Sequence, residues 1–503
     1  MKKLIAYKFI VVFMFFSIAC DEGFDELNTP KTSPTFVDPI FLLNNALVNL
    51  SPTGFAGGST LVYDYGVVQQ IISPVAGVVT GANFNKENRA AGESLWQNYY
   101  RNVIRYTKDV IYAVEIDEER SNLYHMSRIL QAYAFMVLTD TYGEIPYYQG
   151  GMGYIDQVFF LTYDTQEEIY DDIIKELTEA TTGLNAARKI ETSDALFSGN
   201  VDQWKKFGYS LLLRAGMRLS KVAPTKAEDA VQAAYAGGVI LLNTDNVAVK
   251  HDNSYRNPVG VTLNSTEAGN FYLAAPFVEY LQDTEDPRLK AIAVRYPGAT
   301  SSSGQAGTNP ETTVPADQVG LPMGQEGGAF YSFSQVDRKR MAKQTSPYFI
   351  VTAAQNYLLL AEARERGWIT DNDTKYYFDL GVTMHMLQLG TYDPGSAVDP
   401  ADIETYLQDT DTDFDPANAL EQINTQYWIA SFLNGPEAFA NFRRSGYPEL
   451  APNPYVGQDI DEDFIRRLQY PNSEVSSNSE NMGEAVGRMG GESLDTRVWW
   501  DVE

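Results

Sequence analysis

The sequence is poor in the residues that build disulfide frameworks and metal sites. It has a single cysteine, Cys20, and three histidines, His125, His251 and His385, among 503 residues. One thiol excludes a disulfide framework. The histidines are scattered and share no helical-ligand spacing, so neither a zinc site nor a Ser-His-Asp enzyme is indicated, although the three could meet in the folded chain.

Positive charge is also scarce. The chain has 38 Lys and Arg against 66 Asp and Glu, which gives a formal net charge of -28. Such a charge repels phosphate backbones, so we expect no nucleic-acid partner. A polyanionic glycan is disfavoured for the same reason, and a neutral ligand is favoured.

Long hydrophobic runs are missing except near the N-terminus. An apolar run over residues 4–18 follows two lysines and has the length of a signal-peptide core. It ends in a small residue before Cys20, which is where lipoprotein signal peptidase cuts. We therefore expect a lipoprotein signal peptide over residues 1–19, lipidation of Cys20, and an acidic flexible tether over residues 20–40. The alternative is an ordinary secreted protein with a stray cysteine.

Helical periodicity dominates the rest of the chain, in which hydrophobic residues make up 44% of the sequence and indicate a globular protein. Leu130, Ala134 and Val137, for example, are spaced for one buried helix face. Asp164 stands three residues before Glu167 and is a candidate helix cap. The pattern predicts helices over residues 96–116, 123–142, 164–184, 201–222, 227–236, 348–366, 375–389 and 420–432.

Paired helices of this length with small residues at their contact positions indicate helix-turn-helix repeats. Tetratricopeptide repeats consist of helix pairs packed in this way, although no clean 34-residue period is present in this sequence. An irregular helical bundle is the alternative. We expect one mostly α-helical domain over residues 41–503, with helical repeats over about 96–245 and 348–390 and a loop-rich insertion over about 247–345.

The loops combine aromatic rings with amides, which is the chemistry that binds sugars. The apolar C–H faces of a sugar pack on aromatic rings, and amide or guanidinium groups bond its hydroxyls. The alternative is that many of these rings belong to the core. The candidate glycan-binding residues lie in three loop regions and are Tyr63, Tyr65, Asn83, Phe84 and Asn85, then Asn253, Tyr255, Arg256, Asn257, Phe271 and Tyr272, and finally Tyr331 with Phe333 beside it.

One acidic stretch is a calcium candidate. Asp409, Asp411 and Asp413 alternate in DTDTDFDP, and alternating carboxylates can wrap a calcium ion. An EF-hand loop requires Gly at its sixth position and Glu at its twelfth, where this chain has Phe414 and Leu420. A plain acidic loop is therefore favoured, and no cofactor is expected.

Several short motifs occur in a fixed order over most of the chain, and together they are specific. They are TDTYGEIPY at 139–147, Phe197-x-Gly199-Asn200-x-x-x-Trp204-x-Lys206-x-Gly208-x-Ser210-Leu211, Arg214 to Arg218, Asp286-Pro287-Arg288-Leu289, Ala361-Glu362-Ala363 with Gly367-Trp368, Tyr376-Tyr377 with Gly381, Gln426-x-Trp428, FRRSGYP at 442–448, Arg466-Arg467-Leu468-x-Tyr470-Pro471 and Val498-Trp499-Trp500-Asp501. This set resembles the SusD/RagB family, especially its second SusD-like group.

The resemblance implies a mostly helical SusD-like fold with tetratricopeptide-like repeats and an irregular ligand-binding part. It implies a non-catalytic outer-membrane lipoprotein on the cell surface, held to the membrane only by its lipid anchor. Such a protein captures oligosaccharide or polysaccharide and passes it to a SusC-like TonB-dependent transporter. The shared motifs are explained by helix ends, buried arginines and packed tryptophans, so no ligand-binding residue is carried over from the family.

Two other functions stay open at the level of sequence. A peptide-binding surface lipoprotein of the same transporter system is the first, because repeat grooves bind peptides. A surface glycoside hydrolase is the second, because some pair among 66 acidic residues will lie at a catalytic spacing. The aromatic and amide-rich loops favour a sugar ligand without excluding a peptide.

Overall fold

The computed structural model describes residues 37–52, 56–305 and 310–503. The expected signal peptide, Cys20 and most of the expected tether lie outside these residues. Within the described ranges, no helix is both long enough and apolar enough to span a bilayer.

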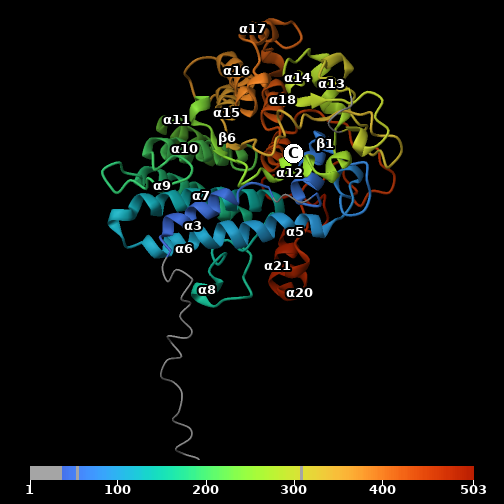
Figure 1. Ribbon diagram of the computed structural model, residues 1–503. Coiled ribbons are helices and arrows are strands. Elements are labelled where there is room, and N and C mark those ends of the chain that lie inside the picture. The colour runs from blue at the N-terminus through green and yellow to red at the C-terminus, as the bar shows by residue number, and fades with distance from the viewer. Residues whose placement is uncertain (1–36, 53–55, 306–309) are drawn as a thin grey trace, which may run out of the picture.

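The first helical block is an array of long helices that pack in chain order (Figure 1). Helix α3 packs on α6, α6 on α7, α7 on α9, α9 on α10, and α10 on α11. Their bounds are α3 Pro39–Val48, α5 Arg89–Asn98, the π-helical segment η4 Tyr99–Ile104, α6 Arg105–Val114, α7 Ser121–Tyr142, α9 Gln166–Gly183, α10 Val201–Arg218 and α11 Pro224–Gly237. The helix expected over 96–116 is thus part of a longer run that begins at Arg89 in α5 and ends at Val114 in α6.

The second helical block lies beside the first and repeats the paired arrangement (Figure 1). Helix α15 packs on both α16 and α18, and α18 packs on α19. Their bounds are α15 Ala353–Glu365, α16 Thr374–Tyr392, α17 Pro400–Gln408, α18 Ala419–Ala430 and α19 Gly435–Ser445. The mostly helical fold with repeated helix pairs, expected from periodicity, is confirmed.

Two local expectations are corrected. The helix expected over 348–366 begins only at Ala353, because Tyr348–Val351 forms strand β6, which pairs antiparallel with β2, Val247–Val249. Helix α9 is capped by Thr165, whose side chain and that of Glu168 form a capping box. The side chain of Asp164 instead accepts a hydrogen bond of 2.8 Å from the backbone N–H of Tyr147.

The chain between β2 and β6 contains only short elements and long connections. Strands β4 and β5 pair within this stretch, and its strand β3 pairs with β1, which lies far upstream of β2. The elements between β2 and β6 are β3 Tyr272–Leu273, β4 Ala293–Val294, β5 Gln335–Val336, α12 Pro258–Leu263, α13 Ala275–Asp283 and α14 Leu289–Ile292, with the 3-10 turns η7 Thr266–Asn270, η8 Ser302–Gln305 and η9 Pro315–Asp317. Strand β1 Ile71–Ile72 and the 3-10 turn η6 Asn243–Asp245 precede β2.

The remaining short elements lie between the longer helices in the sequence or follow α19. They are the π-helical segment η2 Thr60–Asp64, α4 Tyr65–Val67, α8 Gly153–Asp156, α20 Asn472–Ser477 and α21 Ser479–Met489, with the 3-10 turns η3 Ala82–Phe84, η5 Glu118–Arg120, η10 Pro394–Ser396 and η11 Pro416–Asn418.

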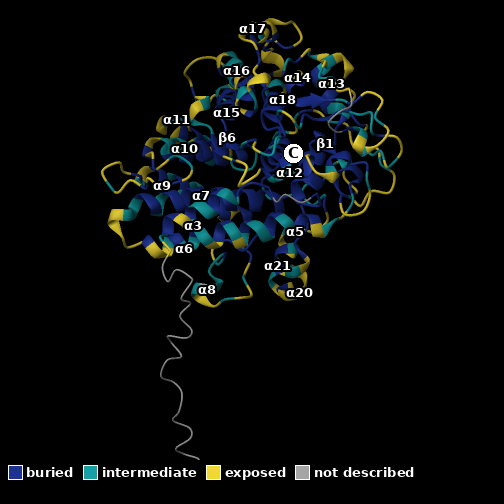
Figure 2. Cartoon of the chain, in the orientation of Figure 1, coloured by how far each residue is buried: buried dark blue, intermediate teal, exposed yellow. Residues whose placement is uncertain are grey.

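Buried ion pairs join helices that are distant in the sequence. Arg444 of α19 makes two bonds of 2.7 Å to the Glu362 carboxylate of α15, and both side chains are almost fully buried. Arg218 of α10 bonds Glu437 of α19 at 2.8 Å and Asp140 of α7 at 3.1 Å. Arg444 and Arg218, which belong to the sequence motifs, therefore hold the helical blocks together. Figure 2 shows that buried residues follow the helix interfaces.

Glycine allows the closest helix approach in the second block. A Cβ added at Gly381 of α16 would lie 2.6 Å from Cγ of Leu358 on α15. We expect Gly381→Ala to lower the free energy of unfolding by about 1–3 kcal/mol, because the two helices would have to move apart. Gly390→Ala in the same helix is the matched control, since its Cβ would lie 3.4 Å from the Ala397 Cβ. Urea unfolding of both variants measures the difference, and equal stability would contradict the packing argument.

Candidate functional site

A small apolar cluster, separate from the main core, supports the loops around β1 and β3. Ile72, Tyr272 and Phe330 are three of its buried members. Tyr272 and Phe330 pack edge to face with ring centroids 5.5 Å apart. The strand pairing of Ile72 with Tyr272 places residues from two distant loops in this cluster.

Side-chain amides join three loops above this cluster, those of residues 73–88, 323–333 and 453–459. The Asn83 amide donates to the carbonyls of Ser73 at 2.8 Å and Gln325 at 3.0 Å, and its oxygen accepts from the Gly324 N–H at 2.9 Å. The Asn453 amide donates to the carbonyl of Asn83 at 2.9 Å. Because the Asn83 amide makes three bonds within the protein, it holds the loops in fixed positions.

The outer surface of this assembly carries partly exposed rings and apolar side chains. We call it the loop face and define it as Val75, Met323, Tyr331, Phe333 and Tyr455. Four of its members pack on the small apolar cluster and keep part of their surface in solvent. The Tyr455 ring lies 4.9 Å from that of buried Phe84, and its hydroxyl donates to Glu326 at 3.0 Å. In Figure 1 the three loops lie together near β1, although they come from the blue, yellow and red parts of the chain.

The first set of predicted glycan-binding residues lies mostly inside the protein. Tyr63, Tyr65 and Phe84 are buried, with at most 2% of their surface exposed. The Tyr63 hydroxyl donates to the Lys86 carbonyl at 2.8 Å, and burial raises the pKa of the Tyr63 hydroxyl. Asn85 is buried as well and donates to Gln458 at 2.9 Å. Tyr63, Phe84 and Asn85 therefore support the loops of the loop face from inside the protein, and no member of this first set that is buried is available at its surface.

The structure divides the second predicted set between two places. Phe271 and Tyr272 are buried at β3, and Tyr272 belongs to the small apolar cluster under the loop face. The other four residues of this set lie elsewhere: Asn253, Tyr255 and Arg256 are exposed, whereas Asn257 is buried.

The turn that carries Tyr255 lies beside α3 and is not part of the loop face. The Tyr255 ring stacks on His251 with centroids 5.1 Å apart, and its hydroxyl donates to the carbonyl of Val48 at the end of α3. The Asn257 side chain accepts from the Gly260 N–H at 3.0 Å and caps α12. Neither contact joins this turn to the loops of residues 73–88 and 323–333.

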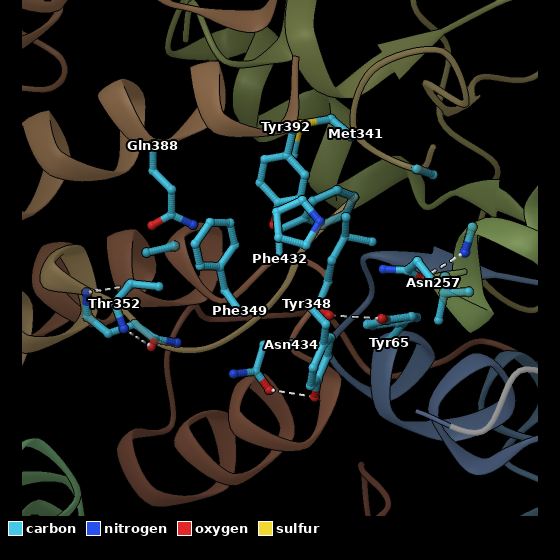
Figure 3. Close-up of a pocket in the computed structure, with 17 residues that line it drawn as sticks. Tyr65, Asn257, Met341, Tyr348, Phe349, Thr352, Gln388, Tyr392, Phe432 and Asn434 are labelled. Carbon is cyan, nitrogen blue, oxygen red and sulfur yellow. Dashed lines mark hydrogen bonds between the residues drawn. The ribbon is translucent and has the colours of Figure 1, made fainter. Parts of the chain in front are cut away.

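A cavity in the centre of the protein is lined by two predicted residues, Tyr65 and Asn257 (Figure 3). Its volume is about 20 Å³, which suits a single water molecule and is far too small for a sugar. The Tyr65 hydroxyl donates to the Leu433 carbonyl at 3.0 Å, and that of Tyr348 donates to Asn434 at 3.3 Å. Burial holds the pKa of the Tyr65 hydroxyl well above its usual range, so this hydroxyl keeps its proton.

The acidic stretch lies at the edge of a cavity of about 460 Å³ beside α17 and α18. Asp411 and Asp413 line this cavity, and Asp413 pairs with Lys375 at 2.6 Å. Asp409 accepts from the backbone N–H of Asp411 at 2.9 Å. Across the described residues, no group of three or more His, Cys, Asp or Glu side chains could hold a metal ion.

The three histidines lie in separate surroundings. His125 is on α7, where burial lowers its pKa to about 4. His251 bonds Ser51 at 3.0 Å, and His385 on α16 bonds Arg288 at 3.1 Å. Each is used in local packing, and they do not converge on one site.

Sequence reasoning missed Val75, Met323 and Tyr455 as members of the loop face. Tyr455 lies in the sequence APNPYVGQ, where two prolines and a glycine indicate an exposed turn with a ring at its tip. That signal could have marked Tyr455 as a candidate. Its position beside Phe84 depends on a contact between residues more than 300 positions apart, which no local pattern predicts.

The fold and the loop face define a helical-repeat protein with an irregular, ring-bearing loop region. Residues 31–471 match the model of the SusD-like family described as "Starch-binding associating with outer membrane". The chain belongs to this family. A search of curated proteins finds no match.

Solved structures of similar proteins cover almost the whole chain. A chitin-binding protein is 29% identical with a TM-score of 0.82, and the match covers 93% of this chain and 100% of that one. A SusD-like protein of Bacteroidetes AC2a is 27% identical with a TM-score of 0.83, at the same coverage. A SusD homologue from Bacteroides uniformis is 26% identical with a TM-score of 0.74, covering 92% of this chain and 100% of that one.

Proposed function

We propose that this protein is a non-catalytic cell-surface lipoprotein, anchored through Cys20, that captures a neutral oligosaccharide or polysaccharide on its loop face. It would deliver this glycan to a SusC-like TonB-dependent transporter. The observation that carries the proposal is the group of partly exposed rings, Tyr331, Phe333 and Tyr455, on loops that side-chain amides hold together. Membership of a family described as starch-binding and associating with the outer membrane supports both the ligand class and the location.

Fixed rings suit the binding of a flexible polar polymer. A sugar loses its hydrogen bonds to water on docking, so affinity depends on apolar contact with surfaces that are already in place. The Asn83 and Asn453 amides lower the ordering cost of the loop face, because they connect all three loops before a ligand arrives. The net charge of -28 further favours a neutral glycan over an acidic one.

The identity of a relative guides the choice of glycans to test. One solved relative is a chitin-binding protein, so a soluble chitin derivative belongs in the panel beside starch, β-glucan, mannan and xylan. Affinity electrophoresis of the mature protein through gels that contain each polysaccharide measures binding directly. Retardation by one polymer without release of reducing sugar is the expected result.

The double variant Tyr331→Ala/Phe333→Ala tests the loop face itself. We expect its affinity for the retarding polysaccharide to fall at least about tenfold, since each ring supplies roughly 1–2 kcal/mol of apolar contact. Tyr112→Ala on α6 is the matched control, because that ring is 60% exposed and lies outside the loop face.

Three outcomes would contradict the proposal. Unchanged retardation of the double variant would place the glycan site elsewhere. Release of reducing sugar that is lost on removal of one carboxylate would indicate a glycoside hydrolase. No retardation by any polysaccharide, together with binding of peptides from a protein digest, would indicate the peptide-binding alternative.

A further inference from the structure

A third cavity, of about 300 Å³, lies against the helical run from α5 to α6. Trp96 and Tyr100 of this run line it, with ring centroids 4.8 Å apart. The Tyr100 hydroxyl donates to the Pro146 carbonyl at 2.7 Å, so the ring is fixed in the cavity wall. In Figure 1 the segments around α8, α20 and α21 project from this side of the molecule, away from the second helical block.

Two arginines in the cavity lining form no ion pair with any described residue, although the charge of Arg105 also acts on Asp109, one turn along the helix. Arg101 and Arg105 stand four residues apart on the helical run, and both are exposed. Among the described residues neither guanidinium takes part in an ion pair, although the chain has 66 acidic residues against 38 basic ones. Arg105 lies over the ring of its neighbour Tyr106, with 4.5 Å between the guanidinium carbon and the ring centroid.

The carboxylate that lines the same cavity is already bonded. Glu474 of α20 accepts from the Tyr163 hydroxyl at 2.8 Å and from the Asn478 amide at 3.2 Å. It pairs with neither arginine. The cavity therefore presents, beside an aromatic wall, two guanidinium groups that form no ion pair among the described residues, and this arrangement suits a carboxylate attached to an apolar body.

The apolar surface continues beyond the cavity onto an exposed loop. Phe159, which lines the cavity, is 76% exposed, and the adjacent Phe160 is 67% exposed. Two amides attach this loop to the α20–α21 region, because Asn478 donates to the Leu161 carbonyl at 2.9 Å and Asn481 donates to that of Phe160 at 3.2 Å. These bonds fix the backbone of the loop that carries the two rings, and large exposed apolar side chains on a fixed loop are typical of a contact surface for another macromolecule.

We propose that this cavity receives a peptide segment of a partner protein in which an acidic residue stands beside an aromatic or branched aliphatic one. The acidic side chain pairs with Arg101 and Arg105. The apolar side chain enters between the Trp96–Tyr100 wall and Phe159, where a volume of about 300 Å³ accommodates one large side chain with its backbone. We choose an acidic peptide because of charge complementarity, since these two guanidinium groups form no ion pair among the described residues of a strongly acidic protein.

The test is a titration of the full mature protein with three defined probes. They are acetyl-Gly-Asp-Phe-Gly-amide, the same peptide with Asn in place of Asp, and phenylacetate. We expect the Asp peptide to bind with millimolar affinity or better and the Asn peptide at least about tenfold more weakly, which is the loss of one charge-assisted contact. Arg101→Gln/Arg105→Gln should weaken the Asp peptide by a similar factor, and Phe159→Ser should weaken both peptides.

Two controls distinguish peptide binding in this cavity from a general effect of charge and from glycan binding at the loop face. Lys250→Gln/Lys290→Gln removes the same charge from two exposed positions and should leave peptide binding unchanged. Retardation in polysaccharide gels should not change in the arginine variant, so the glycan proposal and this one can fail separately. Equal binding of the Asp and Asn peptides, no binding of either, or no effect of the arginine variant would overturn the proposal. Phenylacetate binding as tightly as the Asp peptide would also overturn it, in favour of a site for free carboxylic acids.

Discussion

Replacing Glu362 with alanine is expected to lower the free energy of unfolding by about 3–5 kcal/mol. Glu362 is 1% exposed and bonds Arg444 through both of its oxygens, and Arg366 shares one of these oxygens at 2.8 Å. Without the carboxylate, the Arg444 guanidinium would remain buried with its main counter-charge gone. Because these residues join α15 to α19, the loss should appear in the global unfolding transition measured with urea.

The effect of Glu362→Ala should depend on pH in a defined direction. Burial by itself would raise the pKa of the Glu362 carboxyl, but Arg444 and Arg366 outweigh it and lower the pKa from 4.5 to about 2. A carboxyl whose pKa is lower in the folded state contributes stability above its unfolded pKa and loses it as the pH falls. The stability difference between wild type and variant should therefore shrink as the pH falls from 4.5 towards 2.

The matched control for this prediction is Glu365→Ala, three residues after Glu362 in α15. Glu365 is exposed and accepts a hydrogen bond of 2.9 Å from Thr374. We expect its loss to cost less than about 1 kcal/mol. A similar small cost for Glu362→Ala would show that Arg444 finds another partner.

Replacing Asp64 with asparagine is expected to stabilise the protein by up to about 3 kcal/mol at pH 7. Asp64 closes the π-helical segment η2 and is fully buried. Within the described part of the chain neither of its carboxylate oxygens makes a hydrogen bond of ordinary geometry, although the Thr60 side chain lies close enough to lower the pKa of this carboxyl. Burial raises the pKa of this carboxyl from 3.8 to about 6, against the opposing effects of Thr60 and of the charge of Arg443.

The direction of the pH dependence of Asp64→Asn follows from whether the folded or the unfolded protein holds the proton of Asp64. Between pH 3.8 and about 6 the folded protein keeps the proton of Asp64 while the unfolded chain releases it, so stability falls as the pH rises through this interval. The gain from Asp64→Asn should be full above pH 6 and vanish near pH 4. Thermal unfolding at both pH values measures it, with exposed Asp229→Asn on α11 as the control. No gain at pH 7 would mean that the carboxylate is satisfied in the folded protein.

Periodicity was sufficient to predict the long helices because the spacing of apolar residues along a helix determines which of its faces is buried. The helices expected over 123–142, 201–222 and 375–389 correspond to α7, α10 and α16 within a few residues. The start of α15 could not be predicted in this way. Tyr348–Val351 continues the apolar pattern, but β2 pairs with it from about 100 positions upstream and makes it a strand.

The sequence by itself determined the family, the mostly helical fold and the loops that carry rings. It indicated two of the three segments that form the loop face, those around residues 83–85 and 331–333. Only the tertiary structure decided which side chains face solvent. Tyr63, Tyr65 and Phe84 are buried, whereas Tyr331, Phe333 and Tyr455 remain partly exposed.

The physical reason is that a loop has no regular spacing of apolar residues, so the sequence does not indicate which way an aromatic ring in a loop points. Its burial depends on contacts such as the Asn83 amide with Gln325 and the Asn453 amide with Asn83, which join residues 242 and 370 positions apart. The same holds for Arg101 and Arg105, since only the folded chain shows that no carboxylate of the described residues pairs with them. Local spacing therefore sets which segments are helical, and contacts between distant segments set which side chains are free to bind.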